Sequence, residues 1–139
     1  MDQPFVSVVV PVLNGGPALG DLLTSLAHVD YPAGRIEILV VDNGSTDGSK
    51  ELAEARGVRV LVEPERGASR ARNTGVASAK GSVIAFTDHD CIVTRGWING
   101  LVAVLSDPAV GGAGGRTETY MPKTAVERHA ARTRQLDAE

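Results

Sequence analysis

The sequence predicts an α/β fold, in which a mostly parallel sheet carries helices on both faces. Short runs rich in Val and Ile alternate with segments whose apolar residues recur at helical spacing. The connections are short, and the strand candidates VSVVV and IEILVV are almost continuously apolar. Such strands indicate a sheet that is buried on both faces, as parallel sheets are.

Four strand-and-helix units follow one another along the chain. We expect strands over residues 6–10, 36–41, 58–62 and 83–87. We expect helices around residues 19–26 and over 46–56, 68–79 and 97–105. Pro11 is expected to stop the first strand. Ser45 or Thr46 is expected to cap the second helix, and Gly57 to end it.

Two further elements are predicted near the end of the chain. A Gly-rich strand is expected from Val110 onward, and a weakly amphipathic helix over residues 124–136. Basic side chains on that helix could meet an anionic membrane surface. Its apolar face is thin, however, which favours a solvated helix. We treat residues 1–139 as one domain, since this length suffices for a real core.

Composition narrows the function classes. Lys and Arg number 14 against 17 Asp and Glu, so the net charge of −3 gives no general attraction for nucleic acid. One cysteine excludes an internal disulfide, and no run approaches the roughly 20 apolar residues of a membrane span. With no signal peptide recognisable, we predict a cytoplasmic protein. No G-x-G-x-x-G or Gly-Lys-Ser/Thr motif is present, which disfavours nicotinamide dehydrogenases and P-loop hydrolases.

Two carboxylates follow the fourth strand, in FTDHDC. If this segment is extended, Asp88 and Asp90 project to the same side and both can face one divalent cation. Oxygen ligands of this kind suit Mg²⁺ or Mn²⁺, which often bridge a carboxylate to substrate phosphates. The alternative is a solvated turn in which Asp90 caps the next helix.

The second strand ends at Asp42, which precedes the turn-forming residues NGSTDGS. That segment can be a simple strand-to-helix connection. Asp42 itself has no evident structural task, and its carboxylate could accept a hydrogen bond from a nucleobase N–H or a ribose hydroxyl. Both interpretations remain open from spacing alone.

A basic cluster begins the third helix. Arg66, Arg70 and Arg72 stand near its amino end, where cations gain nothing from the helix dipole. This placement suggests an anionic partner, because Arg binds phosphate in bidentate fashion. The alternative is a solvated face paired with Glu63 and Glu65. The small residues of the same helix are expected to allow close packing on the sheet: Ala68, Ala71, Gly75 and Ala77.

Four segments in this order resemble the family-two inverting glycosyltransferases of GT-A fold: VSVVVPVLNGG, EILVVDNGSTDGS, ERGASRARNTGVASAKG and VIAFTDHDC. The resemblance implies a Rossmann-like GT-A fold and a nucleoside diphosphate sugar donor, most often a uridine one. It implies donor-binding roles for Pro11, Asn14, Asp42, Asp47, Arg72, Asn73 and Asp88. Asp42 would recognise the base. Asp88 and Asp90 would hold the ribose and, through Mn²⁺ or Mg²⁺, the diphosphate.

The same resemblance implies direct displacement at the anomeric carbon, with a carboxylate that deprotonates an acceptor hydroxyl. The acceptor could be a glycan, a lipid-linked molecule or a small molecule. In the family this base lies well downstream of the D-x-D, and Glu118 comes too early to match. We therefore expect a truncated, donor-binding part, with the catalytic base outside this chain. Its exposed sheet edges would then favour self-association.

Two other functions compete with this interpretation. A nucleotide-sugar-binding module, or half of a split enzyme, would bind donor without turnover. A metal-dependent phosphoryl-transfer domain of receiver or haloacid-dehalogenase type would place its acids after the first strand. Residues 11–14, Pro-Val-Leu-Asn, hold no carboxylate there, which argues against that class.

Overall fold

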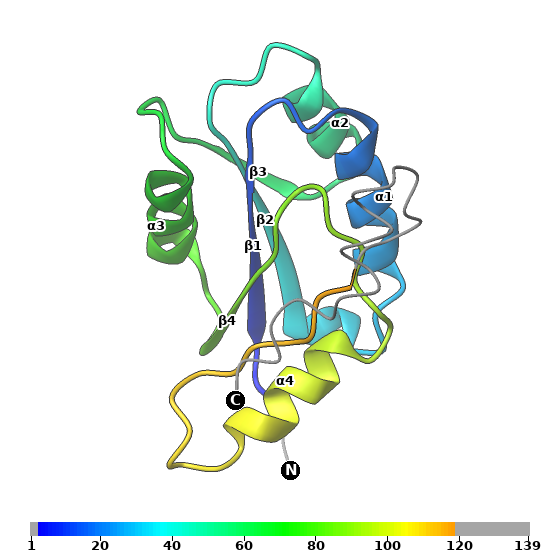
Figure 1. The fold of residues 1–139 in the computed structure, drawn as a ribbon, viewed down its shortest axis with the longest axis vertical. Helices are drawn as coiled ribbons and strands as arrows, with labels where there is room; N and C mark the ends of the chain where they lie inside the picture. Colours follow the sequence, from blue (N-terminus) through cyan, green and yellow to red (C-terminus); the bar gives the residue numbers. More distant parts are fainter. Residues whose placement is uncertain (1–2, 119–139) are drawn as a thin grey trace.

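The computed structural model describes residues 3–118, which form a four-stranded parallel sheet flanked by helices (Figure 1). The strand order is β3-β2-β1-β4, and every neighbouring pair is parallel. The strands are β1 (Val6–Val12), β2 (Ile36–Asp42), β3 (Arg59–Val62) and β4 (Val83–Phe86). The predicted parallel α/β architecture is confirmed.

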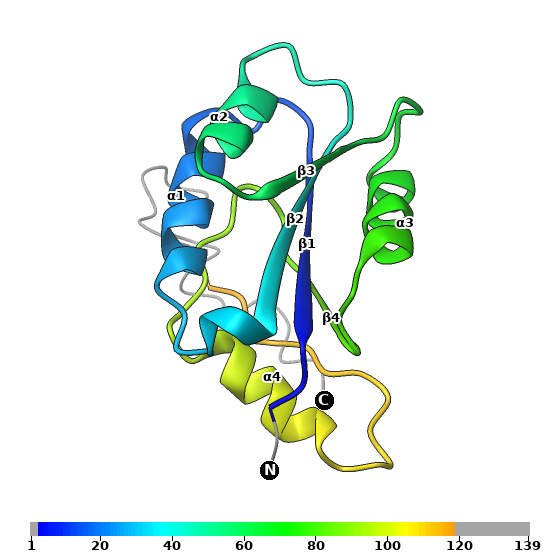
Figure 2. The same cartoon turned by 180° about the vertical axis from the view of Figure 1, so that it is seen from behind.

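Helices cover both faces of this sheet. They are α1 (Gly16–Ala27), α2 (Ser49–Ala55), α3 (Ala68–Ser78) and α4 (Trp97–Leu105), with a short 3₁₀ helix, η1 (Ala33–Arg35). Figures 1 and 2 show α1 and α2 on one face and α3 on the other, with α4 near the amino ends of the strands. Among the described residues, no helix has the length and apolar character needed to cross a membrane.

The core lies on both sides of β1, whose seven residues are all buried. Val8 and Val10 pack in the larger cluster, with the leucines of α1. Val9 packs in the smaller cluster, with Leu39, Val41 and Ala71 of α3. A strand with a core on each face favours apolar residues at nearly every position, which explains the apolar run in the sequence. Ser7 is the buried exception, and its hydroxyl donates to Glu37 Oε1.

Close approach of α3 to the sheet depends on its small residues. A Cβ at Gly75 would lie 2.4 Å from Val9 Cγ1, and Ala71 is fully buried. The packing role predicted for these two residues is therefore confirmed. Ala68 and Ala77 are exposed, so for them the prediction was wrong.

Pro11 does not stop β1, which continues to Val12. Thr87 N donates to Val9 O and Asn43 N to Val12 O, so alternate residues of β1 face β4 and β2. By this alternation Pro11 faces β4, where the next ladder bond would need an N–H that proline lacks. The proline therefore ends β4 at Phe86, while β1 continues along β2.

Three other predicted features differ or lie outside the described residues. The second helix starts at Ser49 after Gly48, so neither Ser45 nor Thr46 is its N-cap. Residues 110–118 form no strand, and they contain four glycines, which weaken strands: Gly111, Gly112, Gly114 and Gly115. The helix predicted over residues 124–136 lies outside the described residues.

Candidate functional site

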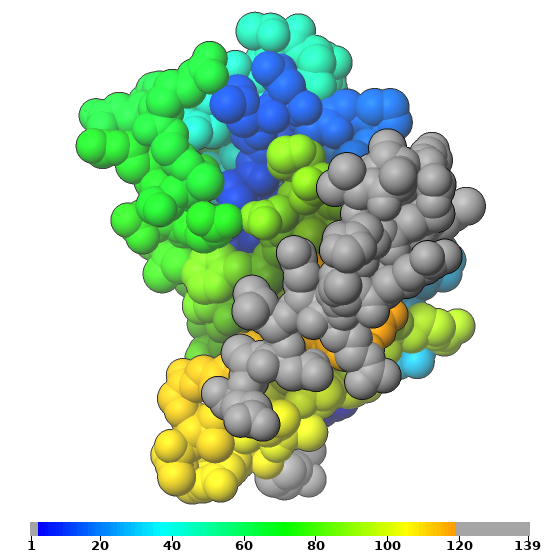
Figure 3. All heavy atoms as spheres, viewed as in Figure 1, coloured from blue at the N-terminus to red at the C-terminus, as the bar shows by residue number. Residues whose placement is uncertain are grey.

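A cavity of about 520 Å³ lies at the carboxyl ends of the strands. Its lining comes from residues 11–13, Asn43, residues 66–68, Arg72 and residues 88–90. In Figure 3 the surface is hollowed between the green spheres of α3 and the yellow-green loop after β4, with blue atoms of the β1 end visible between them. This is the edge at which ligands bind in open parallel sheets.

The chain after β1 is held through three successive backbone amides by the loop after β2 and by Ser49, the first residue of α2. Asn14 N donates to Ser45 Oγ at 2.9 Å, Gly15 N to Ser49 Oγ at 2.9 Å, and Gly16 N to an Asp47 carboxylate oxygen at 2.9 Å. We call this set of three hydrogen bonds the loop clasp. It makes the two loops one unit beside the cavity.

Both Asn14 and Asp47 have structural partners in this region. Asn14 has a φ of 52°, a left-handed conformation that Asn tolerates, and its Oδ1 accepts a hydrogen bond from Thr46 N at 2.8 Å. Asp47 accepts from both the hydroxyl and the N–H of Ser49. The Ser49 hydroxyl bond, followed by N–H donors that include Gly16, lowers the pKa of Asp47 below its ordinary value.

Asp42 is buried, with 4% of its surface exposed. Its carboxylate accepts backbone N–H groups from Gly44 at 3.3 Å and Ser45 at 3.3 Å. The expectation that Asp42 lacks a structural task was therefore wrong, because it forms the turn that starts this loop. An ionised carboxylate offers about four acceptor sites, so capacity remains for a ligand N–H.

Asn43 was not singled out by sequence reasoning, yet it organises the next loop. Its Nδ2 donates to Glu63 O at 2.9 Å and Glu65 O at 2.8 Å, while Gly67 N donates to its Oδ1 at 2.9 Å. The side chain is buried and lines the cavity. It therefore fixes the segment that carries Arg66 into α3. An Asn directly after a strand end was the available signal.

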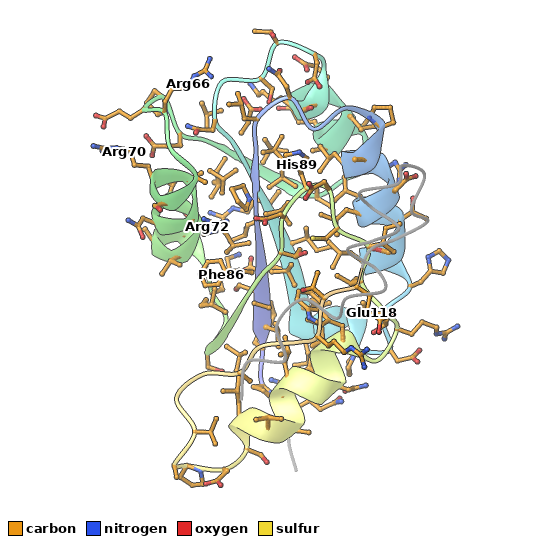
Figure 4. The ribbon with its side chains drawn as sticks, viewed as in Figure 1. Arg66, Arg70, Arg72, Phe86, His89 and Glu118 are labelled. Carbon is orange, nitrogen blue, oxygen red and sulfur yellow. The ribbon has the colours of Figure 1, made fainter. Side chains whose placement is uncertain are left out.

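The basic cluster divides into residues that face the cavity and one that does not. Arg66 and Arg72 line it, whereas Arg70 pairs with Glu65, as the alternative interpretation predicted for that residue. Figure 4 shows Arg66 and Arg70 at the outer end of α3 and Arg72 closer to His89. Asn73 is exposed and does not contribute to the lining.

The two acids after β4 lie in a turn. Cys91 N donates to Asp88 O at 3.1 Å, so the expectation of an extended segment was wrong. Asp88 Oδ1 accepts a hydrogen bond from Arg72 Nη2 at 2.9 Å, which joins the turn to α3. Both carboxylates still line the same cavity.

His89, between the two acids, packs against the first loop. A Cβ at Gly15 would lie 3.3 Å from His89 Cδ2, closer than an ordinary contact, so the ring lies close to the backbone at Gly15. Sequence reasoning gave His89 no role, and its contact depends on a turn geometry that spacing does not reveal.

A divalent cation fits this donor set only with help from a ligand. Within residues 3–118, no group of three or more His, Cys, Asp or Glu side chains is placed to hold a metal. The two carboxylates of the turn are nevertheless suitable for Mg²⁺ or Mn²⁺, which commonly take one or two protein carboxylates plus substrate phosphates. The residues present therefore fit a metal that a diphosphate would help to coordinate.

Comparison with known proteins identifies the family. The sequence model described as glycosyl transferase family 2 matches residues 7–137 of the 139. The chain belongs to glycosyl transferase family 2. Glycosyltransferase AglE of Haloferax volcanii is 38% identical to this family 2 chain over 134 residues, which are 91% of this chain and 44% of AglE.

Solved structures agree with the fold. Mannosyltransferase PcManGT from Pyrobaculum calidifontis, in complex with GDP-Man and Mn²⁺, superposes with a TM-score of 0.75 at 32% identity. The match covers 79% of this family 2 chain and 34% of PcManGT. S. aureus TarS 1–349 with UDP-GlcNAc gives 0.65 at 25% identity, covering 84% of this chain and 38% of TarS.

These matches confirm the GT-A fold predicted from the four motifs. The family 2 chain also spans less than half of the length of AglE, PcManGT and TarS 1–349. The described residues thus correspond to a part of a longer fold in each of these proteins.

Proposed function

We propose that this chain is the donor-binding part of an inverting glycosyltransferase, which takes a nucleoside diphosphate sugar with Mn²⁺ or Mg²⁺ at Asp88 and Asp90. The observation that carries the proposal is one cavity lined by these two carboxylates and by Arg66 and Arg72. Carboxylates can bind the metal cation and arginines the phosphate oxygens, so this cavity suits a diphosphate with a bound metal.

Roles for the remaining residues follow from their positions. Asp42 would accept the nucleobase N–H: it does not line the cavity itself, but it directly precedes Asn43, which does, and its carboxylate keeps acceptor capacity. Pro11 forms part of the cavity lining, whereas Asn14 and Asp47 would act through the loop clasp. A direct contact of Asn73 with the donor stays a prediction.

The metal, when bound, would supply positive charge to the leaving diphosphate. The protein's own part is to hold that group in one orientation. Asp88 and Asp90 would bind the cation, and Arg66, which has no ion-pair partner among residues 3–118, would face the phosphates.

The base that deprotonates the acceptor is not evident among the described residues. Glu118 pairs with Arg116 at 3.0 Å and does not line the cavity (Figure 4). Transfer to an acceptor hydroxyl, whether of a glycan, a lipid-linked molecule or a small molecule, would then need residues outside this set. Donor binding without turnover is the competing function, and a cytoplasmic location stays a prediction.

The nucleobase of the donor is open between two alternatives, guanine and uracil. PcManGT is described with GDP-Man and TarS with UDP-GlcNAc. Calorimetric titration of UDP and of GDP, each with and without Mn²⁺, decides between them. We expect saturable binding of one nucleotide, strengthened by Mn²⁺ and weakened at least tenfold in Asp90→Asn.

The matched control is Asp21→Asn, which removes an equal charge from an exposed position on α1. It should bind like the wild type. If neither nucleotide binds the wild type, the proposed donor site is wrong. If Mn²⁺ has no effect and Asp90→Asn behaves like the control, the metal assignment alone is wrong.

A further inference from the structure

Arg72 occupies the carboxylate that the proposed metal would need. Its Nη2 lies 2.9 Å from Asp88 Oδ1, across the cavity from α3 to the turn after β4. Asp90, two residues later, makes no ion pair among residues 3–118. The two acids of the turn are therefore in different states: Asp88 is engaged by a cation and Asp90 is not.

This arrangement sets up a competition. A divalent cation at Asp88 would have to approach a carboxylate that already holds a guanidinium, and two positive groups at such short range repel each other. Arg72 therefore weakens metal binding in the absence of nucleotide. A diphosphate in the same cavity would offer Arg72 a new anionic partner, for which the planar guanidinium is well suited.

We propose that Arg72 is a positioning residue that exchanges Asp88 for the donor diphosphate, and that this exchange couples nucleotide binding to metal binding. The inference rests on the proposed function, because it assumes a metal at Asp88 and Asp90. Before the donor arrives, Arg72 keeps Asp88 oriented toward the cavity. Once the diphosphate engages Arg72, Asp88 is released to the cation.

The solvent exposure of the Arg72–Asp88 pair sets the size of its effect on Mn²⁺ binding. The Arg72 side chain is 36% exposed and that of Asp88 57%, so solvent screens the pair. Exposed ion pairs are weak, and breaking this one should strengthen the binding of Mn²⁺ alone by about two- to five-fold. Coupling is reciprocal, so the factor by which UDP or GDP strengthens Mn²⁺ binding should fall by a similar amount.

Arg66 supplies a matched control. It lines the same cavity and carries the same charge, but it does not pair with Asp88. Arg66→Gln therefore changes the general electrostatic field of the cavity and leaves the Arg72–Asp88 pair intact. Arg72→Gln removes the pair itself, and Arg72→Lys keeps the charge without the planar fork.

The experiment measures free Mn²⁺ by electron paramagnetic resonance at low ionic strength, with and without the nucleotide that binds. We expect Arg72→Gln to bind Mn²⁺ alone about two- to five-fold more tightly than wild type, with a correspondingly smaller gain from nucleotide. Arg66→Gln should gain less, and Arg72→Lys should lie between wild type and Arg72→Gln.

Three results would overturn the inference. Unchanged or weaker binding of Mn²⁺ alone in Arg72→Gln would show that the pair does not compete with the metal. Equal gains in Arg66→Gln and Arg72→Gln would show a general charge effect. Absence of Mn²⁺ binding in every variant, even with nucleotide, would overturn the metal assignment of the proposed function as well.

Discussion

At the scale of single residues, the site depends on backbone amides as much as on acids. Asn14, Gly15 and Gly16 each donate an N–H to a side chain of the loop after β2 or of Ser49 at the start of α2. Because Ser49 and Gly15 are buried, water does not replace these partners readily. The loop clasp therefore predefines the position of the first loop before any ligand binds.

Removing the Ser49 hydroxyl tests this directly. In Ser49→Ala the buried Gly15 N–H loses its partner at 2.9 Å, and an unsatisfied buried donor costs about 1–3 kcal/mol. We expect this decrease in the free energy of unfolding, measured by urea denaturation. Ser69→Ala, at an exposed position of α3, is the control and should change stability little. Equal effects in the two variants would contradict the clasp.

The charge of Asp47 gives a pH-dependent test. Hydrogen bonds from Ser49 and Gly16 lower the pKa of Asp47 below the ordinary 3.8. These hydrogen bonds to the ionised carboxylate are therefore fully present above pH 3.8. It should be lost only as pH falls through the lowered pKa. We expect the Gly16 amide resonance in NMR spectra to be constant from pH 7 to about pH 4.5. Its titration midpoint should lie below 3.8.

A midpoint at or above the ordinary value would show that the carboxylate is not held by these donors. In Asp47→Asn the acidic transition of the Gly16 amide should disappear, since an amide does not titrate in this range. A transition that persists in this variant would have to come from another group.

At the scale of elements, the contact of α3 with the sheet is a sensitive point. A Cβ at Gly75 would also lie 3.3 Å from Val41 Cγ2, so Gly75→Ala compresses α3 against both β1 and β2. Overpacking of this kind costs about 1–3 kcal/mol, although alanine favours the helix by about 1 kcal/mol. We expect a net decrease in the denaturation midpoint.

Gly100→Ala is the matched control for this substitution. Gly100 is also inside a helix, α4, but no atom lies within 4 Å of a Cβ placed there. Only helix propensity acts at this position, so the variant should be more stable by up to about 1 kcal/mol. Changes of the same sign in both variants would contradict the packing argument.

Sequence periodicity predicted the alternating elements well because both faces of β1 are buried, which leaves an unambiguous apolar pattern. It could not predict what depends on partners distant in sequence. Pro11 was expected to end its own strand, β1. It instead ends β4, the neighbouring strand that pairs with β1. The ion pair of Asp88 with Arg72 also joins residues 16 positions apart, which periodicity does not reveal.

The site residues, too, were predicted only in part, because some of their roles depend on partners distant in sequence. The motifs brought Asp42, Arg72, Asp88 and Asp90 to one edge of the sheet, because parallel strands end there together. Spacing did not distinguish residues beside the cavity from residues that hold its loops. Asn43 was missed for this reason. Asn14 and Asp47 were assigned to the donor, although Asn14 accepts from Thr46 N and Asp47 accepts from Gly16 N and from Ser49.

At the scale of the whole molecule, β4 is an edge strand, since among residues 3–118 it pairs with β1 alone. Val83 N donates to Phe5 O, just before β1, and Thr87 N donates to Val9 O of β1, so by alternation the backbone groups of Ile84 and Phe86 face away from β1. A cavity of about 630 Å³ between β4 and α4 adjoins this edge, and the described residues that line it include no charged one. Phe86 is 46% exposed. An uncharged, apolar edge of this kind favours strand pairing with another chain.

We therefore expect this 139-residue chain to form dimers in which two β4 strands pair antiparallel across a two-fold axis. Ile84 of each copy would then face Phe86 of the other. Sedimentation velocity over a range of concentrations should show a monomer–dimer equilibrium that Phe86→Lys abolishes. Val62→Lys, at the opposite edge on β3, should leave it unchanged, although Val62 is 54% exposed. A wild type that stays monomeric throughout, or equal disruption by both lysines, would show that β4 is not the contact.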